Sequence, residues 1–130
     1  MLLQVGVKII LKNFEGKVLL LKRNAEKYPG MKNTWDIPGG RIEPGTPLLE
    51  NLKREIMEET SLVYTGNPIL VCAQDILRPD KHVVRLTYSG EISGEPKLDE
   101  EHTDYTWVSL NELRTMEGVD EYLREAIDSL

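Results

Sequence analysis

One stretch of the chain, GGRIEPGTPLLENLKREIMEET over residues 39–60, constrains the fold more than any other. Two glycines and a polar loop lead into a run of apolar residues at helical spacing. Thr46 suits the N-cap of a helix there, and Pro47 suits its first position. The pattern therefore predicts a helix from Pro47 to Thr60. The apolar stripe expected to face the core consists of Leu48, Leu49, Leu52 and Ile56.

Three glutamates fall on one face of this helix, beside the apolar stripe. Glu58 and Glu59 follow Glu55 by three and four residues, so their like charges repel one another. One interpretation is that they are solvated, with Arg54 paired to Glu58 and Glu50 paired to Arg54. The other is that they hold a hard divalent cation, since carboxylate oxygens are the ligands that Mg²⁺ and Mn²⁺ prefer. Helical spacing alone does not decide between the two.

The rest of the chain predicts two hairpins, a further strand and two helices. Segments 5–11 and 17–23 are rich in branched apolar residues and flank a turn, and segments 69–77 and 82–90 are joined by a Pro-Asp turn. A strand, TWVSL, leads into a helix with a capping box at Ser109 and Glu112. Because hairpins impose antiparallel pairing, we expect an α+β domain with a mixed sheet. The last helix follows Gly118, and its predicted inner face consists of Leu123, Ala126, Ile127 and Leu130.

Length and composition narrow the functional class. A chain of 130 residues without a repeat or linker indicates one domain over residues 1–130. With 22 acidic and 16 basic side chains the net charge is −6, which disfavours stable nucleic-acid binding. No apolar run approaches the ~20 residues needed to span a bilayer, so we expect a soluble protein with no membrane partner. The single Cys72 lies in an apolar run, where a buried, unreactive thiol is expected, and this suits the cytoplasm.

The glycine entry and the carboxylate helix together resemble the signature of the Nudix hydrolase family, and of its MutT-like members. That signature reads Gly, five residues, Glu, seven residues, then Arg-Glu-aliphatic-any-Glu-Glu-any-Gly-aliphatic. Seven of its nine positions agree with this chain. The nine positions fall on Gly40, Thr46, Arg54, Glu55, Ile56, Glu58, Glu59, Ser61 and Leu62. Thr46 replaces a Glu, and Ser61 replaces a Gly at a left-handed helix end, where other residues cost about 1 kcal/mol. The segments LLLKR, WDIPGG and EEHTDYTWVSLNEL extend the resemblance over most of the chain.

The resemblance implies a fold and a reaction. The fold is a Nudix-type α/β/α sandwich with a mixed, largely antiparallel sheet and a catalytic strand–loop–helix unit. The reaction is hydrolysis of a pyrophosphate bond in a nucleoside triphosphate or related nucleoside diphosphate derivative, with Mg²⁺, or Mn²⁺, as cofactor. The alternatives are ADP-ribose, another nucleotide sugar or a dinucleotide as substrate, or a regulatory domain that binds nucleotide without turnover.

The resemblance also implies a metal site. Its ligands would be the Gly39 carbonyl and the carboxylates of Glu55, Glu58 and Glu59, with Arg54 orienting the glutamates. A further ligand or general base is expected from the loop that contains residues 100 and 101, and Glu101 is preferred over Glu100. The alternative for this loop is a solvated acidic segment.

Three residues are predicted to contact substrate. Arg23 matches a basic family position near substrate, although an ordinary exposed strand-end arginine is an equal alternative. Gly40 allows close approach of the backbone, and Tyr28 lies in a polar loop where it could touch a base. His102 is expected to be a surface group, and the alternative for it is a base near neutral pH. The sequence leaves open the nucleotide, the number of metal ions, and whether the protein is a monomer or a homodimer.

Overall fold

The computed structural model describes residues 1–130 and contains a sheet of seven strands and three helices. The strands are β1 (Leu2–Lys12), β2 (Val18–Arg23), β3 (Trp35–Asp36), β4 (Gly39–Arg41), β5 (Ile69–Leu77), β6 (Lys81–Glu91) and β7 (His102–Val108). The helices are α1 (Leu48–Thr60), α2 (Leu110–Thr115) and α3 (Glu121–Ile127). None of the three helices has the length and apolar character that crossing a bilayer requires.

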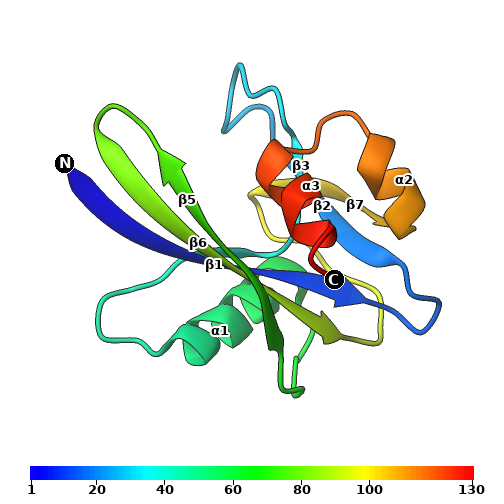
Figure 1. Cartoon of the computed structure of the whole chain (residues 1–130). Helices are drawn as coiled ribbons and strands as arrows, with labels where there is room; N and C mark the ends of the chain where they lie inside the picture. The colour runs from blue at the N-terminus through cyan, green and yellow to red at the C-terminus, as the bar shows by residue number, and fades with distance from the viewer.

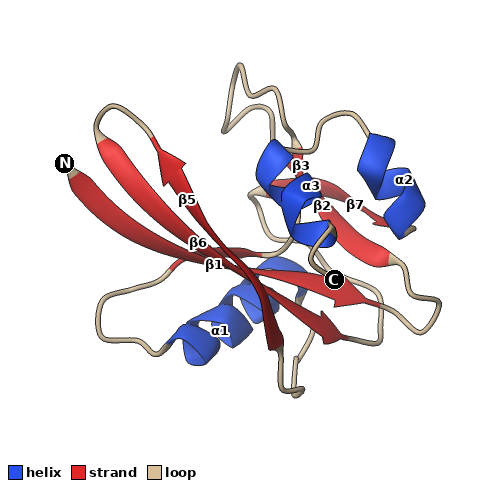
Figure 2. Cartoon of the chain, in the orientation of Figure 1, coloured by secondary structure: helices blue, strands red, loops and turns tan.

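The sheet lies between two helical layers, which confirms the expected α+β sandwich (Figure 1). Helix α1 covers one face, and α2 and α3 cover the other (Figure 2). Side chains of β1 alternate between these layers: Val7, Ile9 and Leu11 pack on the α1 side, whereas Ile10 packs with α2 and α3. All four are completely buried. The sheet therefore carries a hydrophobic core on each face.

Both predicted hairpins are present, but the first pairs over a short distance. Strands β5 and β6 pair antiparallel from Ile69↔Ser89 to Leu77↔His82. Strands β1 and β2 pair only at Lys12↔Val18, and β1 instead forms a parallel ladder with β6 along its whole length. Five of the six strand pairings are antiparallel, so the sheet is mixed and largely antiparallel, as predicted.

Apart from their one shared pair, β1 and β2 have different neighbours in the sheet. Between β3 and β4 the chain passes from the side of β2 to the side of β1. Strand β3 pairs with β2, and β4 pairs with β1. The crossing demands glycine at position 39, where φ is +134° and a Cβ atom would lie 2.1 Å from the Val7 carbonyl oxygen. Gly39 therefore lets the chain run directly against β1.

Helix α1 begins at Leu48, one residue later than predicted, with Pro47 as its N-cap. The Pro47 carbonyl accepts a hydrogen bond from the Asn51 N–H at 3.0 Å. The N–H of Thr46 instead donates to the Glu43 carbonyl at 3.0 Å, and no side chain caps the helix. The prediction of Thr46 as N-cap was wrong because its backbone belongs to the preceding turn.

The apolar stripe of α1 is narrower than predicted. Leu52 and Ile56 are completely buried and Leu48 packs against the same cluster, but Leu49 is 40% exposed. The placement of Leu49 was wrong although helical spacing puts it on the same side as Ile56, because it lies in the first turn of α1, at the end of the helix. Asn51 is buried instead, and its amide bonds backbone groups of residues 41 and 43. It thus fixes the loop that leads into the helix.

Ser61 ends α1 in the left-handed conformation, with φ 60° and ψ 15°, as the helix-end position predicts. It is the only residue other than glycine with a positive φ. Its hydroxyl donates to the Lys97 carbonyl at 3.1 Å, a contact that glycine cannot make. The fold therefore accommodates the departure from glycine at a local cost of about 1 kcal/mol.

The C-terminal helices form as predicted except at the last residue. Ser109 accepts from the Glu112 N–H and the Glu112 carboxylate accepts from the Ser109 N–H, which completes the capping box. The core residues of α3 are Leu123, Ala126 and Ile127. Leu130 was wrongly placed on the inner face, because the helix ends at Ile127 and Leu130 is 44% exposed.

Cys72 on β5 is partly buried against the core on the α2 and α3 side, less completely than predicted. Burial raises the pKa of its thiol, and the charge of Glu125 raises it further. A raised pKa leaves little thiolate, so an unreactive thiol is the consequence.

Candidate active site

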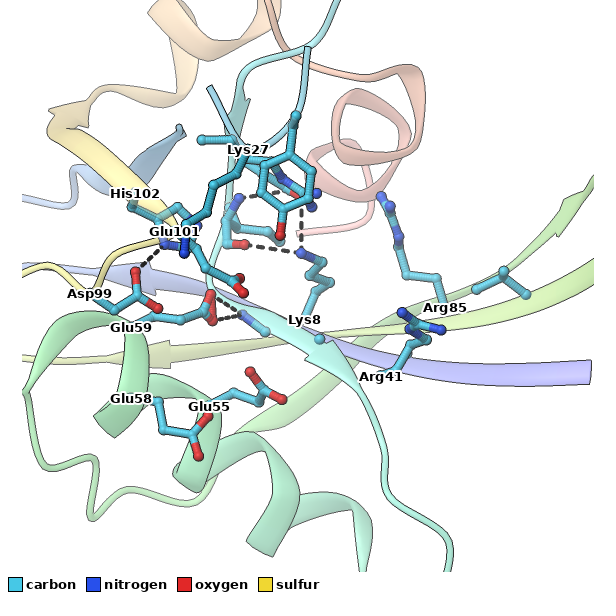
Figure 3. A pocket seen from close by; sticks show the side chains of 18 of the residues that line it. Lys8, Lys27, Arg41, Glu55, Glu58, Glu59, Arg85, Asp99, Glu101 and His102 are labelled. Carbon is cyan, nitrogen blue, oxygen red and sulfur yellow. Dashed lines mark hydrogen bonds and ion pairs between the residues drawn. The ribbon is translucent and has the colours of Figure 1, made fainter. Parts of the chain in front are cut away.

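A cavity of about 830 Å³ lies between the sheet, α1 and the two loops that precede β3 and β7 (Figure 3). Only 3 of its 21 lining residues are hydrophobic, so it suits a polar or charged ligand. Eight of the nine predicted site residues line it, and these are Arg23, Tyr28, Gly39, Gly40, Glu55, Glu58, Glu59 and Glu101. Arg54 lies outside the cavity.

The three clustered glutamates of α1 occupy different environments. Glu59 is only 6% exposed, makes no ion pair, and accepts hydrogen bonds from the Gly39 N–H at 3.2 and 3.4 Å. Burial raises the pKa of Glu59 to about 8, against the opposing effects of Lys8 and the Gly39 N–H. Burial likewise raises the pKa of Glu55, despite the nearby charge of Arg54. Glu58 is exposed, so the cost of burying a charged carboxylate falls on Glu59 and Glu55.

Arg54 connects the exposed edge of this cluster to the loop before α1. Its guanidinium donates to Glu58 Oε1 and to Asn51 Oδ1, each at 3.0 Å, and lies 3.5 Å from Glu55 Oε1. The Arg54–Glu58 pair of the solvated interpretation is therefore present, whereas Glu50 does not pair with Arg54. The contacts are those of a residue that holds two glutamates in place without entering the cavity.

Gly40 and Glu55 are in close contact. A Cβ atom at position 40 would lie 3.1 Å from the carboxylate carbon and both oxygens of Glu55. Glycine at this position therefore keeps open the space that the Glu55 carboxylate occupies.

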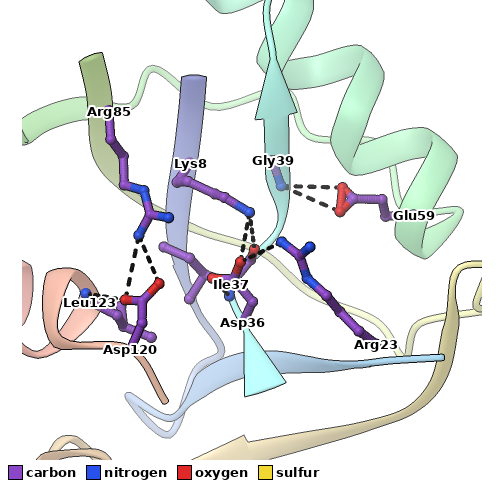
Figure 4. A network of polar contacts seen from close by, with 9 residues as sticks. All are labelled: Lys8, Arg23, Asp36, Ile37, Gly39, Glu59, Arg85, Asp120 and Leu123. Atoms are coloured by element: carbon purple, nitrogen blue, oxygen red, sulfur yellow. Dashed lines mark hydrogen bonds and ion pairs between the residues drawn. The ribbon is translucent and has the colours of Figure 1, made fainter. Parts of the chain in front are cut away.

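A buried ion-pair network, which the sequence analysis missed, forms the floor of the cavity (Figure 4). Lys8 Nζ and Arg23 Nη2 donate to Asp36 Oδ2 at 2.9 and 3.0 Å. Burial alone would raise the pKa of Asp36, but Lys8, Arg85 and Arg23 together lower it to about 2. The available signal was Lys8 itself, a charged residue in the middle of an apolar strand. The network ties β1, β2 and β3 together where the chain crosses to β4.

The acidic loop before β7 lines the cavity beside the C-terminal end of α1, where the Lys97 N–H donates to the Thr60 carbonyl at 2.8 Å. Glu100 lies 3.6 Å from Lys27, whereas Glu101 lies beside Tyr28: burial and then the Glu101 charge raise the pKa of the Tyr28 hydroxyl. His102 was predicted as a surface group, but its side chain is only 8% exposed, and its Nδ1 lies 2.7 Å from Asp99 Oδ1. This prediction was wrong because β7 begins at His102 and turns the ring inward.

Arg23 does not end in solvent, the alternative that the sequence left open. Besides its bond to Asp36, its guanidinium carbon lies 5.5 Å from the centre of the Tyr28 ring. The two side chains therefore stack at one side of the cavity.

The donor chemistry of this site fits a hard divalent cation. No three His, Cys, Asp or Glu side chains converge closely enough in this structure to enclose an ion. Yet Glu59 is a buried carboxylate without a cationic partner, with Glu55 nearby and both pKa values raised. Asp36, equally buried, is fully neutralised by two cations. A divalent cation bound there would supply the positive charge that the glutamates lack.

The fold and the carboxylate helix define the class of protein. The NUDIX domain family matches residues 2–130, and the chain belongs to this family. The solved structure of a MutT protein from Methanosarcina mazei Go1 is 29% identical, with a TM-score of 0.85 over 98% of this chain and 91% of that one.

Two curated relatives differ in the substrate that their names give. Nucleoside triphosphatase NudI of Escherichia coli is 30% identical over 112 residues, which cover 76% of this chain and 77% of NudI. The ADP-ribose pyrophosphatase of Methanocaldococcus jannaschii is 31% identical over 101 residues, which cover 76% of this chain and 58% of that protein. The chain spans only part of some curated relatives. Its match to the m7GpppN-mRNA hydrolase NUDT17 of Xenopus laevis covers 19% of that protein.

Proposed function

We propose that the chain hydrolyses a pyrophosphate bond in a nucleoside triphosphate or related nucleoside diphosphate derivative, with a divalent cation as cofactor. The observation that carries this proposal is the buried, unpaired carboxylate of Glu59 beside Glu55, at the wall of a large polar cavity. Such a group is costly in a protein unless a cation neutralises it. A regulator that only bound nucleotide would have no evident need for it.

The residues that would hold the cation are Glu55, Glu58, Glu59 and the Gly39 carbonyl. When bound, Mg²⁺ or Mn²⁺ offsets the negative charge of the phosphates and lowers the pKa of water. Arg54 orients Glu58 and Glu55, and Gly40 leaves room for the Glu55 carboxylate. Nothing in the donor set separates Mg²⁺ from Mn²⁺, since both prefer oxygen ligands.

The remaining predicted residues are proposed to act on substrate from β2 and from the loops that precede β3 and β7. Tyr28, stacked on Arg23, offers an aromatic face to the base or the ribose. Glu101 is exposed at the cavity and is the proposed base that accepts a proton from water. A second candidate substrate is ADP-ribose, favoured by the similarity to the pyrophosphatase of M. jannaschii. A cytoplasmic location and a monomeric or homodimeric state stay predictions.

Activity on a panel of nucleoside triphosphates, ADP-ribose and dinucleotides tests the proposal. With Mg²⁺ we expect turnover of at least one compound, with products that locate the cleaved bond, and with excess EDTA we expect none. Hydrolysis undiminished by EDTA would contradict the role of the cation. A lack of turnover on the whole panel, with either metal, would contradict the proposed reaction.

The acidic loop contains a matched pair of test variants. Glu101→Gln is expected to lower kcat by at least about tenfold, because it removes a base at the cavity. Glu100→Gln removes the same charge from the adjacent residue, which faces Lys27, and should change kcat by less than about twofold. Rates for the two variants, measured at one saturating substrate concentration, compare them directly. Equal and small effects would return both residues to a solvated loop.

A further inference from the structure

The floor of the cavity continues along β1, away from the glutamates, into a part that the proposed chemistry does not use. This part, the basic end of the cavity, is lined by Gln4, Gly6, Arg41, Lys81, Val83 and Arg85. It contains three cations and no carboxylate, whereas the acidic residues of the lining come from α1, the loop before β7 and, at the floor, Asp36 of β3, which Lys8 and Arg23 neutralise. The cavity is therefore divided into an acidic end and a basic end.

Two arginines flank Gly6 in the basic end. The strand register pairs Gly6 with Arg41 of β4 on one side and with Arg85 of β6 on the other. Residues paired across adjacent strands point to the same face of the sheet. Figure 3 shows both arginines on the opposite side of the cavity from Glu58 and Asp99.

Glycine at position 6 keeps the space between the two arginines open. A Cβ atom there would meet nothing closer than the Gly40 carbonyl oxygen, at 3.8 Å, so packing of the sheet does not require glycine. Gly6 also has no positive φ that would demand it. What its missing side chain provides is room for a ligand group between Arg41 and Arg85.

Arg85 is held in position by the protein itself. Its Nη1 donates to both carboxylate oxygens of Asp120, at 3.1 and 3.4 Å, and its guanidinium carbon lies 5.4 Å from the centre of the Tyr122 ring. Asp120 is held in turn as the N-cap of α3, where it accepts from the Leu123 N–H (Figure 4). The Nε and Nη2 groups of Arg85 make no hydrogen bond within the protein. Arg85 thus presents free donors from a fixed guanidinium.

Arg41, unlike Arg85, has no carboxylate partner in the protein. Its side chain is exposed and forms no ion pair or hydrogen bond within the protein, and the same holds for the ammonium of Lys81. Asp120 offsets the charge of Arg85, so Arg41 and Lys81 leave the basic end with a net positive charge. An anionic group is therefore the ligand that this end favours.

We propose that Arg41 and Arg85 form a subsite for a phosphate group of the substrate beyond the diphosphate that is cleaved. The row of Arg41, Gly6 and Arg85 lies two residues along β1 from the row of Gly39 and Lys8, or about 7 Å. A guanidinium presents parallel N–H donors that match two phosphate oxygens. The subsite rests on the proposed hydrolysis and narrows its substrate class. It favours nucleoside triphosphates, which carry a third phosphate, over ADP-ribose, whose groups beyond the diphosphate are uncharged.

The kinetic test compares kcat/KM for a nucleoside triphosphate and for ADP-ribose. Arg41→Gln and Arg85→Gln should each lower kcat/KM for the triphosphate by about tenfold to a hundredfold, the effect of losing a charged hydrogen bond. ADP-ribose, if turned over, should change by less than about threefold. Arg78→Gln is the matched control, since Arg78 lies in the turn between β5 and β6, outside the cavity, and should alter neither value. Equal losses for both substrates, or a parent protein that turns over ADP-ribose alone, would overturn the subsite but leave hydrolysis standing.

A binding measurement separates the subsite from the proposed reaction. Inorganic triphosphate should raise the melting temperature of the metal-free protein, because a ligand stabilises the folded state that binds it. The rise should be retained in Arg78→Gln and largely lost in Arg41→Gln and Arg85→Gln. Arg85→Gln also frees Asp120, so Arg41→Gln, which breaks no contact in the protein, is the decisive variant. An equal rise in the parent and in Arg41→Gln would refute the subsite, whatever the enzyme assay shows.

Discussion

Replacing Glu59 with glutamine is expected to stabilise the metal-free protein while it removes activity. The pKa of Glu59 is raised from 4.5 to about 8 by burial, so at pH 7 the folded protein keeps a proton on this carboxyl that the unfolded chain has released. Relative to an uncharged side chain, this lowers the free energy of unfolding by about 3 kcal/mol. Glutamine is uncharged and retains an oxygen that can accept from the Gly39 N–H. The free energy of unfolding of Glu59→Gln in EDTA should therefore exceed that of the parent by about that amount. With Mg²⁺ present, turnover should fall at least about a hundredfold, because a proposed ligand is lost.

The raised pKa of Glu59 also predicts how the stability of the metal-free protein changes with pH. A carboxyl group whose pKa is higher in the folded than in the unfolded state contributes its full stability below pH 4.5. That contribution is lost as the pH rises towards about 8, so the metal-free parent should become less stable over this range. In Glu59→Gln the free energy of unfolding should decline much less over the same pH range. Denaturant unfolding at a series of pH values measures this difference.

Glu58→Gln is the matched control for charge removal. Glu58 is exposed and pairs with Arg54, so its loss should cost a few tenths of a kcal/mol, roughly the value of an exposed i,i+4 pair. A Glu59→Gln protein that is less stable than the parent in EDTA would contradict the assignment of strain to Glu59. The same assignment would be contradicted if the free energy of unfolding declined equally with pH in the parent and in Glu59→Gln.

The two adjacent glycines are expected to fail in different ways when replaced by alanine. In Gly39→Ala the new Cβ would lie 2.1 Å from the Val7 carbonyl oxygen and 2.7 Å from Lys8 Cα, both backbone atoms of β1. Since φ is also +134°, we expect the free energy of unfolding to fall by more than about 4 kcal/mol, or folding to fail. In Gly40→Ala the atoms nearest the new Cβ are those of the Glu55 carboxylate, at 3.1 Å. That protein should fold, with turnover lowered at least about tenfold because the carboxylate is displaced.

Gly16→Ala controls for the strain of a positive φ alone. Gly16 has φ +76° with nothing within 4 Å of a new Cβ, so alanine there should cost about 1 kcal/mol. Chemical denaturation of the three variants, with activity measured on those that fold, completes the comparison. If Gly39→Ala loses no more stability than Gly16→Ala, then the close passage of β4 against β1 is not a constraint on the fold. If Gly40→Ala is fully active, the position of Glu55 is not set by the space at residue 40.

Local patterns were sufficient to predict most helices and turns. The capping box at Ser109 and Glu112, and the left-handed end at Ser61, depend on hydrogen bonds and backbone angles within four residues of one another. The same holds for the spacing that puts Leu52 and Ile56 on the buried side of α1. The errors at Thr46, Leu49 and Leu130 all lie at helix ends. There, a turn or the last hydrogen bond of the helix decides the outcome, and residue type alone does not.

By itself, the sequence determined that three glutamates share one face of a helix that follows two glycines and a polar loop, because helical periodicity is a local property. Only the tertiary structure decided that Glu59 is buried and Glu58 exposed. The reason is that burial and pKa depend on Lys8, Gly39 and Asp99, which are distant along the chain. The Lys8–Asp36 pair and the arginines beside Gly6 likewise come together only through the register of β1 with its neighbours. A period of two residues shows which side chains share a face of one strand, but not which side chains of another strand lie beside them.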